Sequence, residues 1–353
     1  MHLERNDVAI MRRIILSLLT LLMLLASCRQ KQSGLHQEQK EQTRKNCNAV
    51  YYWRTTFRLS PEEREFLRFH QIERMYLRYF DVYRDVDFQD QVVPVPEATL
   101  RFIDSVPPDL EVIPTVFIDN NLFRDCDMMQ CAELLASRIL TMTETNDVPN
   151  VSEVQLDCDW TQTTEEAFFN FLKKVDSLLK KDSITLSATI RLHQLKTKAP
   201  PVERGVLMCY NTGSVRNPQT NNSILSAADV ALYADNVQSY SLPLDAAYPT
   251  FSWAVWFRGN KFQALVRNLT PENENLVLVK ENIYRVKKSF YQEGKYLSAG
   301  DEIRFETSDF EQIMQAKKLL EKRLKDYSVI IYHLDYSNLS KYSRDEINKI
   351  YAR

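Results

Sequence analysis

The sequence predicts an α/β protein whose body is a closed (β/α)8 barrel of the TIM type, with a β-hairpin insertion late in the chain. From residue 49 onward, apolar runs rich in β-branched residues alternate with helical patterns, and such alternation indicates a parallel sheet covered by helices. The body is roughly 300 residues long, which is ordinary for such a barrel and long for other single domains. A doubly wound open sheet is the alternative fold.

Eight runs have the composition of buried strands. They cover residues 49–57, 74–82, 112–118, 154–160, 184–192, 206–210, 240–247 and 328–334. Helical patterns lie between them, at residues 132–142, 164–181, 227–237 and 310–325. A further helix is expected to begin at Pro61 with Ser60 as its N-cap, because serine at the cap and proline at the first helical position are both favoured.

One region does not fit an ideal barrel. Residues 251–257 and 261–266 are two strand-like runs, and Arg258-Gly259-Asn260 separates them, so we expect a β-hairpin between the last two barrel strands. Trp253 and Trp256 lie on opposite faces of its first strand, because side chains alternate along a strand. One ring can line a cleft while the other packs inward; the alternative places both rings in the core.

The first 28 residues have the pattern of a secretion signal. Two arginines after Met11 precede an apolar run at residues 14–25, and small residues follow at 26–27; this run is too short for an ordinary membrane span. Residues 25–28, Leu-Ala-Ser-Cys, resemble the bacterial lipobox, which implies that Cys28 becomes the lipidated first residue. We therefore expect a lipoprotein anchored in the bacterial cell envelope, in the periplasm or on the outer-membrane surface. An uncleaved anchor is the alternative.

A short linker separates this signal from the body. Residues 29–46 are polar, rich in Gln and Lys, and without apolar periodicity, so they are predicted to form a flexible tether. The remaining residues, 47–353, are predicted to form the single barrel domain.

Composition argues against several classes of function. The net charge is −2, with acidic and basic residues interspersed, and the chain has 6 glycines. No nucleic-acid-binding face, phosphate-cradling loop or cofactor is therefore expected. No Cys-x-x-Cys or paired-His motif is present, so no metal site is expected. Cys158 and Cys209 lie within predicted strands and are expected to be buried free thiols. The aromatic content of 11% suits a carbohydrate-binding surface and equally suits a large core.

Acidic and other polar residues gather at the carboxyl ends of the predicted strands, where (β/α)8 barrels carry their active sites. In chain order they are Asp81, Asp119, Asp157, Asp159, Arg191, His193, Tyr210, Asn211, Asp245, His333 and Asp335. For each acid alone, a helix cap or an ion pair with Arg54 or Arg78 is an equally good explanation. Their clustering at one end favours a functional site.

Asp157 and Asp159 are predicted to point to the same face at the end of the fourth strand. Burying two carboxylates is costly unless they are hydrogen-bonded or serve a site. The residues 157–161, Asp-Cys-Asp-Trp-Thr, resemble the Asp-x-Asp-x-Glu signature of the family 18 glycoside hydrolases, the chitinases and endo-β-N-acetylglucosaminidases. Residues 208–211, Met-Cys-Tyr-Asn, are similar to that family's Met-x-Tyr-Asp, and residues 186–189 are also similar. The body as a whole resembles a group of bacterial lipoproteins with such barrels.

This resemblance implies a carbohydrate ligand, such as a glycan containing an N-acetylhexosamine. Asp159 would orient the acetamido group of the sugar, Asp157 would support Asp159, and Tyr210 would hydrogen-bond the same acetamido group. That chemistry also needs a general acid. Thr161 stands where the family has glutamate, and a threonine hydroxyl cannot serve as that acid; Asn211 replaces the family's aspartate.

Three functions remain open. The first is a glycan-binding lipoprotein whose catalytic acid is missing. The second is an active glycoside hydrolase that uses another carboxylate: Asp81, Asp119, Asp245, Asp335 or Glu165. The third is a structural or assembly lipoprotein in which the acids stabilise the barrel. Besides the catalytic candidates Asp157, Asp159 and Tyr210, the residues expected to contact a bound carbohydrate are Asp81, Asp119, Asn211, Asp245, Trp253 and Asp335.

Overall fold

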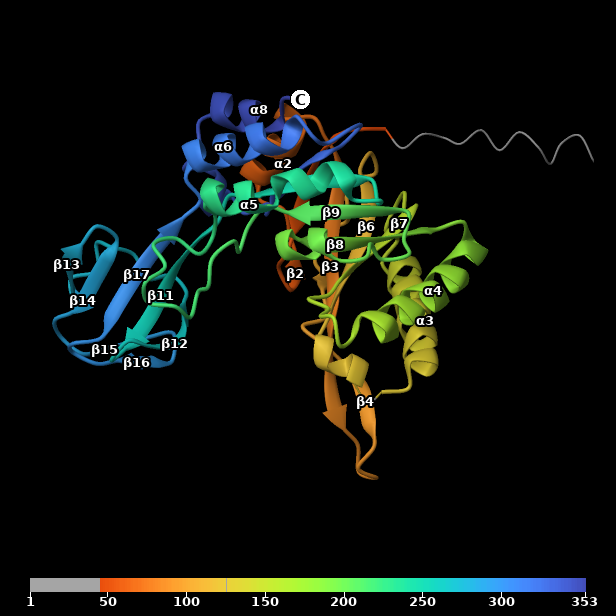
Figure 1. The fold of residues 1–353 in the computed structure, drawn as a ribbon, viewed down its shortest axis with the longest axis horizontal. Coiled ribbons are helices and arrows are strands. Elements are labelled where there is room, and N and C mark those ends of the chain that lie inside the picture. Colours follow the sequence, from red (N-terminus) through yellow and green to blue (C-terminus); the bar gives the residue numbers. More distant parts are fainter. Residues whose placement is uncertain (1–44, 125) are drawn as a thin grey trace, which may run out of the picture. The chain divides into compact units, whose positions relative to one another are not determined.

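The computed structural model describes residues 45–124 and 126–353 (Figure 1). Residues Asn46–Arg353 form one compact unit. The predicted signal, its lipidation site Cys28 and nearly all of the predicted tether lie outside the described residues. Within the described part, no helix is both long and apolar enough to span a membrane.

The predicted barrel is confirmed. In the described part of the chain, a parallel sheet closes on itself because β1 pairs with both β18 and β3. Its strands are β1 (Asn48–Tyr52), β3 (Ile72–Val86), β6 (Glu111–Ile118), β7 (Glu153–Asp157), β8 (Thr185–Arg191), β9 (Arg204–Met208), β10 (Leu244–Pro249) and β18 (Val329–Tyr332). Closure places the carboxyl ends of all these strands at one mouth.

The segment between β3 and β6 departs from the regular pattern, because strands stand where a regular (β/α)8 barrel has a helix. β3 runs past the barrel and pairs antiparallel with β4 (Val92–Glu97). Pro94 and Pro96 fit β4 because it is an edge strand, where a missing N–H leaves no gap in the sheet. β5 (Arg101–Phe102) then pairs with β2 (Thr56–Phe57). The first strand predicted from the sequence is therefore two strands in the structure, β1 and β2.

The helices begin where local sequence favours them. Ser60 caps α2 (Pro61–Phe69) in a capping box with Glu63, as expected. Asp127 caps α3 (Met128–Thr145), Ser226 caps α5 (Ala227–Ser239) and Asp309 caps α6 (Phe310–Glu321). The other helical elements are η1 (Asn120–Arg124), α4 (Glu165–Leu179), η2 (Lys180–Asp182), η3 (Leu192–Lys196), α7 (Tyr336–Leu339) and α8 (Arg344–Tyr351).

The insertion between β10 and α6 is larger than the predicted hairpin. The hairpin itself is confirmed as β11 (Ser252–Arg258) and β12 (Lys261–Val266). It belongs to an antiparallel sheet with β13 (Leu276–Lys280), β14 (Ile283–Val286) and β17 (Glu302–Thr307), accompanied by the small hairpin β15 (Phe290–Gln292) and β16 (Lys295–Leu297). Figure 1 shows this sheet as a separate layer of strands.

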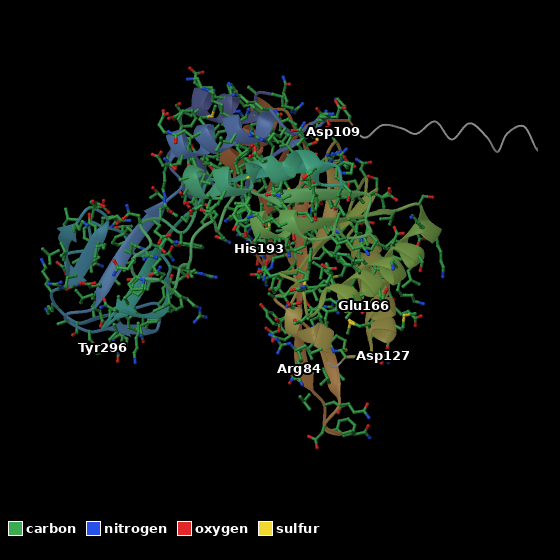
Figure 2. All side chains as sticks on the ribbon, viewed as in Figure 1. Arg84, Asp109, Asp127, Glu166, His193 and Tyr296 are labelled. Carbon is green, nitrogen blue, oxygen red and sulfur yellow. The ribbon has the colours of Figure 1, made fainter. Side chains whose placement is uncertain are left out.

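The barrel and the insertion have separate hydrophobic cores. Trp256 is 8% exposed and packs in the core of the insertion, whereas Trp253 on the opposite face is half-buried against the barrel core. Tyr291 and Tyr296 lie on the surface of the insertion, where Figure 2 labels Tyr296. Cys158 and Cys209 are buried free thiols, as predicted.

Candidate functional site at the barrel mouth

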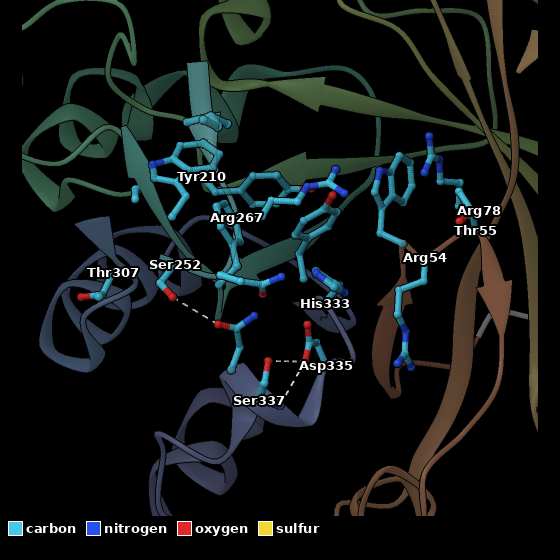
Figure 3. A pocket seen from close by; sticks show the side chains of 18 of the residues that line it. Arg54, Thr55, Arg78, Tyr210, Ser252, Arg267, Thr307, His333, Asp335 and Ser337 are labelled. Atoms are coloured by element: carbon cyan, nitrogen blue, oxygen red, sulfur yellow. Dashed lines mark hydrogen bonds between the residues drawn. The ribbon is translucent and has the colours of Figure 1, made fainter. Parts of the chain in front are cut away.

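A cavity of about 1820 Å³ opens at the carboxyl ends of the barrel strands. Strand ends from the barrel line it, and so do β11, β17 and the chain after β12 from the insertion (Figure 3). Aromatic rings form much of its wall: Trp53, Tyr83, Phe117, Tyr210, Phe251, Trp253 and Tyr332. Pockets for small molecules measure roughly 300–1,000 Å³, so this cavity has room for an extended ligand.

Asp157 is buried and lines the cavity. It is the last residue of β7, and the Thr189 hydroxyl donates a hydrogen bond of 2.6 Å to it. Burial raises the pKa of Asp157 to about 6, although the nearby Arg191 guanidinium and the Thr189 hydrogen bond partly oppose this rise. Its carboxyl group can therefore exchange a proton near neutral pH.

Asp159 does not share the inward face with Asp157, which corrects the prediction. β7 ends at Asp157, so the alternation of side chains does not continue to Asp159. The Asp159 side chain is 51% exposed and forms a two-point ion pair with Arg191, whose Nη2 lies 3.0 Å from Oδ2. Asp159 is not among the residues that line the cavity.

Tyr210 follows β9 and places a phenol group in the cavity. The side chain is buried, and its ring packs against Tyr332 with 4.7 Å between the ring centroids. Its hydroxyl has no hydrogen-bond partner among the described residues. Burial raises the pKa of Tyr210, so the hydroxyl is neutral and can donate a hydrogen bond to a ligand.

Asp81 also lines the cavity, but Arg78 neutralises it. The two side chains form a two-point ion pair three residues apart on β3, with Nε 2.8 Å from Oδ1. The Arg78 guanidinium also lies over the Trp53 ring, at 5.5 Å from its centroid. An ion pair with Arg78 is one of the structural roles that the sequence suggested for the acids at the strand ends, and Asp81 has this role.

Asp335 and His333 follow β18 and line the same cavity (Figure 3). Asp335 caps α7, since it accepts hydrogen bonds from the backbone and hydroxyl groups of Ser337 at 3.0 and 2.6 Å. Burial lowers the pKa of His333 to about 4, against the attraction of Asp335. The imidazole is therefore neutral at pH 7.

Asp119 and Asp245 do not line the cavity. Asp119 accepts hydrogen bonds from the backbone and side chain of Asn121 at the start of η1. Asp245 was predicted at the carboxyl end of a strand covering 240–247, but β10 begins at Leu244, so Asp245 lies at the amino end. There it pairs with Arg204 at 3.2 Å and accepts from the Ser328 backbone at 2.8 Å.

Thr161 and Glu165 lie outside the cavity, whereas Asn211 lines it. The exposed Thr161 hydroxyl shares a 2.9 Å hydrogen bond with Thr163. Glu165 begins α4 and borders a separate cavity of about 320 Å³. Asn211 is exposed with φ of +54°, a left-handed conformation that asparagine tolerates better than most residues.

One wall of the cavity is held by a buried ion pair that the sequence pattern did not indicate. Glu306 on β17 accepts a 2.5 Å hydrogen bond from Arg304, and both side chains are at most 2% exposed. Its other oxygen accepts hydrogen bonds from the Trp253 indole at 2.8 Å and from Ser223. Arg304 also donates to the carbonyl oxygen of Asn217 at 2.8 Å. This network ties the loop after β9 to the insertion and orients Trp253. Alternation along β17 could have placed Arg304 and Glu306 on one face, but not their partners.

These features define a (β/α)8 barrel with an aromatic, charged cavity at the carboxyl mouth. Among the described residues, no group of three or more His, Cys, Asp and Glu side chains is arranged to hold a metal ion.

The fold is that of chitinase-like barrels. No protein-family description matches the chain, and no curated protein matches it in sequence. A chitinase from Chromobacterium violaceum superposes with a TM-score of 0.51 at 8% identity, over 87% of this chain and 99% of that chain. The C-terminal domain of a putative chitinase from Desulfitobacterium hafniense gives 0.50 at 9% identity, over 87% and 100%. The spore cortex-lytic enzyme SleL from Bacillus cereus gives 0.49 at 14% identity, over 87% and 75%.

Proposed function

We propose that this protein is a lipid-anchored envelope protein that binds a carbohydrate in the cavity at the barrel mouth. The observation that carries the proposal is the Tyr210 hydroxyl, which is buried, unpartnered among the described residues and set in a wall of aromatic rings. Sugar rings pack their C–H faces on aromatic side chains, while a buried donor without a partner favours a ligand that offers a hydrogen-bond acceptor. The acetamido group of an N-acetylhexosamine offers such an acceptor.

Binding without turnover is the favoured form of this proposal. Thr161 stands at the position of the family's proton donor and lies outside the cavity. Asp81 is paired with Arg78, Glu306 is paired with Arg304, and Asp335 caps a helix. The oxygens of these carboxylates are already engaged by their partners, so none of the three is free to hydrogen-bond a leaving-group oxygen as a general acid must.

Asp157 supports a second candidate, an active glycoside hydrolase. Its pKa of about 6 is that of a carboxyl group able to donate a proton near neutral pH. It also lines the cavity. Turnover would then require Asp157 to act as the acid in place of the missing glutamate.

A glycan-array and hydrolysis screen of the purified full-length protein, kept in a detergent without a sugar headgroup, tests both candidates. We expect binding of glycans that contain N-acetylhexosamine, weakened by Tyr210→Phe and left unchanged by Tyr291→Phe, which removes a hydroxyl from the exposed surface of the insertion. Hydrolysis that Asp157→Asn abolishes would establish the second candidate. Absence of any glycan binding would contradict the proposal and favour a structural or assembly role.

The anchor is tested separately. Cells that express the protein are labelled with an alkyne analogue of palmitate, and the envelope fraction is probed for the labelled chain. We expect Cys28→Ala to abolish labelling, while Cys47→Ala, which alters a buried cysteine at the start of the barrel, leaves labelling intact. Labelling that survives Cys28→Ala would contradict the lipoprotein assignment.

A further inference from the structure

We propose that the carbohydrate is anionic, that is, a saccharide whose sugars carry carboxylate groups. This inference rests on the proposed function and specifies its ligand. The geometry that points to it is the arrangement of charges around the cavity, where the acidic side chains are largely neutralised by partners of their own and several arginines are not.

The acids of the cavity wall are engaged by neighbouring residues. Glu63 accepts two hydrogen bonds of 2.9 Å from Arg54, and it also completes the capping box of α2. Asp81 and Glu306 are held by Arg78 and Arg304, and Asp335 caps α7. Asp157 is buried beside Arg191. Glu272, after β12, remains as an exposed acid of the lining.

Three arginines of the same lining, Arg58, Arg101 and Arg267, are exposed and form no ion pair with a described residue. The charge of Arg58 does act on Asp104, but the ion pair of Asp104 is with Arg64. Lys341 is a further cation of the lining: its ammonium donates to the oxygens of Ser252 and Asn338 at 2.7 and 3.1 Å, and the charge of Asp335 also acts on it. Among the described residues, the cavity lining therefore includes exposed arginines that form no ion pair.

These cations come from separate segments of the chain. Arg58 follows β2 and Arg101 lies on β5, which pairs with β2. Arg267 follows β12 in the insertion, and Lys341 follows α7; Figure 3 shows Arg267 among the side chains of the wall. Trp53, Trp253 and Tyr332 also line the cavity. An oligosaccharide in this space can stack on the rings while its charged substituents reach the cations.

The chemistry of the cations favours carboxylates. A guanidinium group presents parallel N–H donors that match the two oxygens of a carboxylate. A neutral glycan would contact the same aromatic rings but would gain nothing from the charges of Arg58, Arg101 and Arg267. An acidic glycan gains from both, and its attraction to the cavity weakens with added salt because these side chains are exposed.

Isothermal titration calorimetry of the full-length protein with two hexasaccharides tests the inference. Hyaluronan hexasaccharide alternates glucuronate with N-acetylglucosamine, and chitohexaose contains N-acetylglucosamine alone. At low ionic strength we expect hyaluronan hexasaccharide to bind at least tenfold more tightly than chitohexaose. That ratio should shrink severalfold when salt is raised to about 0.5 M, where the screening length falls to a few ångströms. A pair of chondroitin hexasaccharides, one sulfated and one unsulfated, separates recognition of carboxylates from recognition of any anion.

Variants that remove a positive charge test whether the preference for hyaluronan hexasaccharide over chitohexaose arises in the cavity. We expect Arg101→Gln and Arg267→Gln each to lower the hyaluronan-to-chitohexaose affinity ratio by about two- to fivefold, the range for an exposed ion pair. Lys318→Gln, which removes an exposed cation from α6 outside the cavity, leaves the ratio unchanged.

Three outcomes would overturn the inference. Equal affinities for the two hexasaccharides, or a ratio that both arginine variants leave intact, would remove the charge argument while leaving carbohydrate binding in place. Tighter binding of sulfated than of unsulfated chondroitin would reject carboxylate recognition. Binding of none of the saccharides would instead reject the proposed function.

Discussion

At the scale of single residues, the candidate site is determined by which charged groups have partners. Arg78 and Arg191 each engage an acid that the sequence placed at the mouth, namely Asp81 and Asp159. Asp157 differs from both because it is buried and bonded mainly to a neutral hydroxyl. Its proton equilibrium is therefore the feature of the site that a change of pH should reveal first.

The raised pKa of Asp157 predicts a pH-dependent stability. Between the usual pKa of 3.8 and the folded value of about 6, the native state binds more protons than the unfolded state, so the free energy of unfolding falls as pH rises. The difference between the two pKa values contributes about 3 kcal/mol to the free energy of unfolding. This contribution is fully present below the unfolded pKa and is lost above pH of about 6. Urea unfolding at several pH values should show this component in the native protein. It should be missing in Asp157→Asn, while Asp345→Asn, which removes an exposed acid from α8, should retain it.

Glu306 is predicted to be costly to replace. Glu306→Gln leaves the Arg304 guanidinium buried without a countercharge, and breaking a buried ion pair from one side costs roughly 3–5 kcal/mol. Glu302→Gln is the matched control on the same strand, because its pair with Arg285 is partly exposed and worth at most about 1 kcal/mol. The comparison is made by chemical denaturation. Equal losses in the two variants would contradict the importance of the buried network.

At the scale of elements, additions to the barrel form much of the site. The insertion supplies Trp253, Arg267 and Glu306, and the segment after β1 supplies Trp53 and Arg54. The regular barrel strands contribute mainly the floor. Loops and insertions at the carboxyl mouth can vary without disturbing the strands beneath them, so the specificity of this barrel is expected to depend on these additions.

Ser60 and Glu63, which form the capping box of α2, also line the cavity. Ser60→Ala removes the side-chain bond to the Glu63 backbone and should destabilise the protein by about 1 kcal/mol. Ser177→Ala, in an exposed position within α4, should change stability by less than about 0.5 kcal/mol. Thermal unfolding of both variants provides the measurement. A smaller loss at Ser60 than at Ser177 would show that the cap does not stabilise α2.

At the scale of the whole molecule, the barrel and the insertion are predicted to differ in local stability. The barrel strands are closed into a ring without a free edge, whereas β13 is an edge strand with exposed Val277 and Leu278. Amides in β13 should exchange with deuterium sooner than those in β9 and β10, because edge strands open with less loss of buried contact. Hydrogen-exchange mass spectrometry resolves these peptides. Slower exchange in β13 than in β9 would contradict this order.

The sequence predicted the barrel because its central strands, such as 154–160 and 206–210, are short apolar runs between amphipathic helices. The sequence predicted the first and last residues of the strands less accurately than their existence. Residues 240–243 are apolar enough to extend β10 backward, and this error moved Asp245 to the wrong end of its strand. The end of β7 at Asp157 could not be seen in the sequence either, so Asp159 was placed on the inward face.

The network around Glu306 could not be predicted for a different reason. Its members come from three segments that are far apart in the chain, with Ser223 after β9, Trp253 on β11 and Arg304 on β17. No local pattern links them. Hydrophobic periodicity reports which face of a strand is buried, but not which polar partners meet there.

The same network has a consequence for how quickly a ligand can be captured. Because charge-assisted hydrogen bonds already fix Trp253 and the loop after β9, that wall of the cavity has little left to order when a saccharide arrives. Association should then follow a single exponential whose rate rises linearly with saccharide concentration, as expected for a preorganised surface. Removal of Glu306 would add a slow rearrangement to the time course.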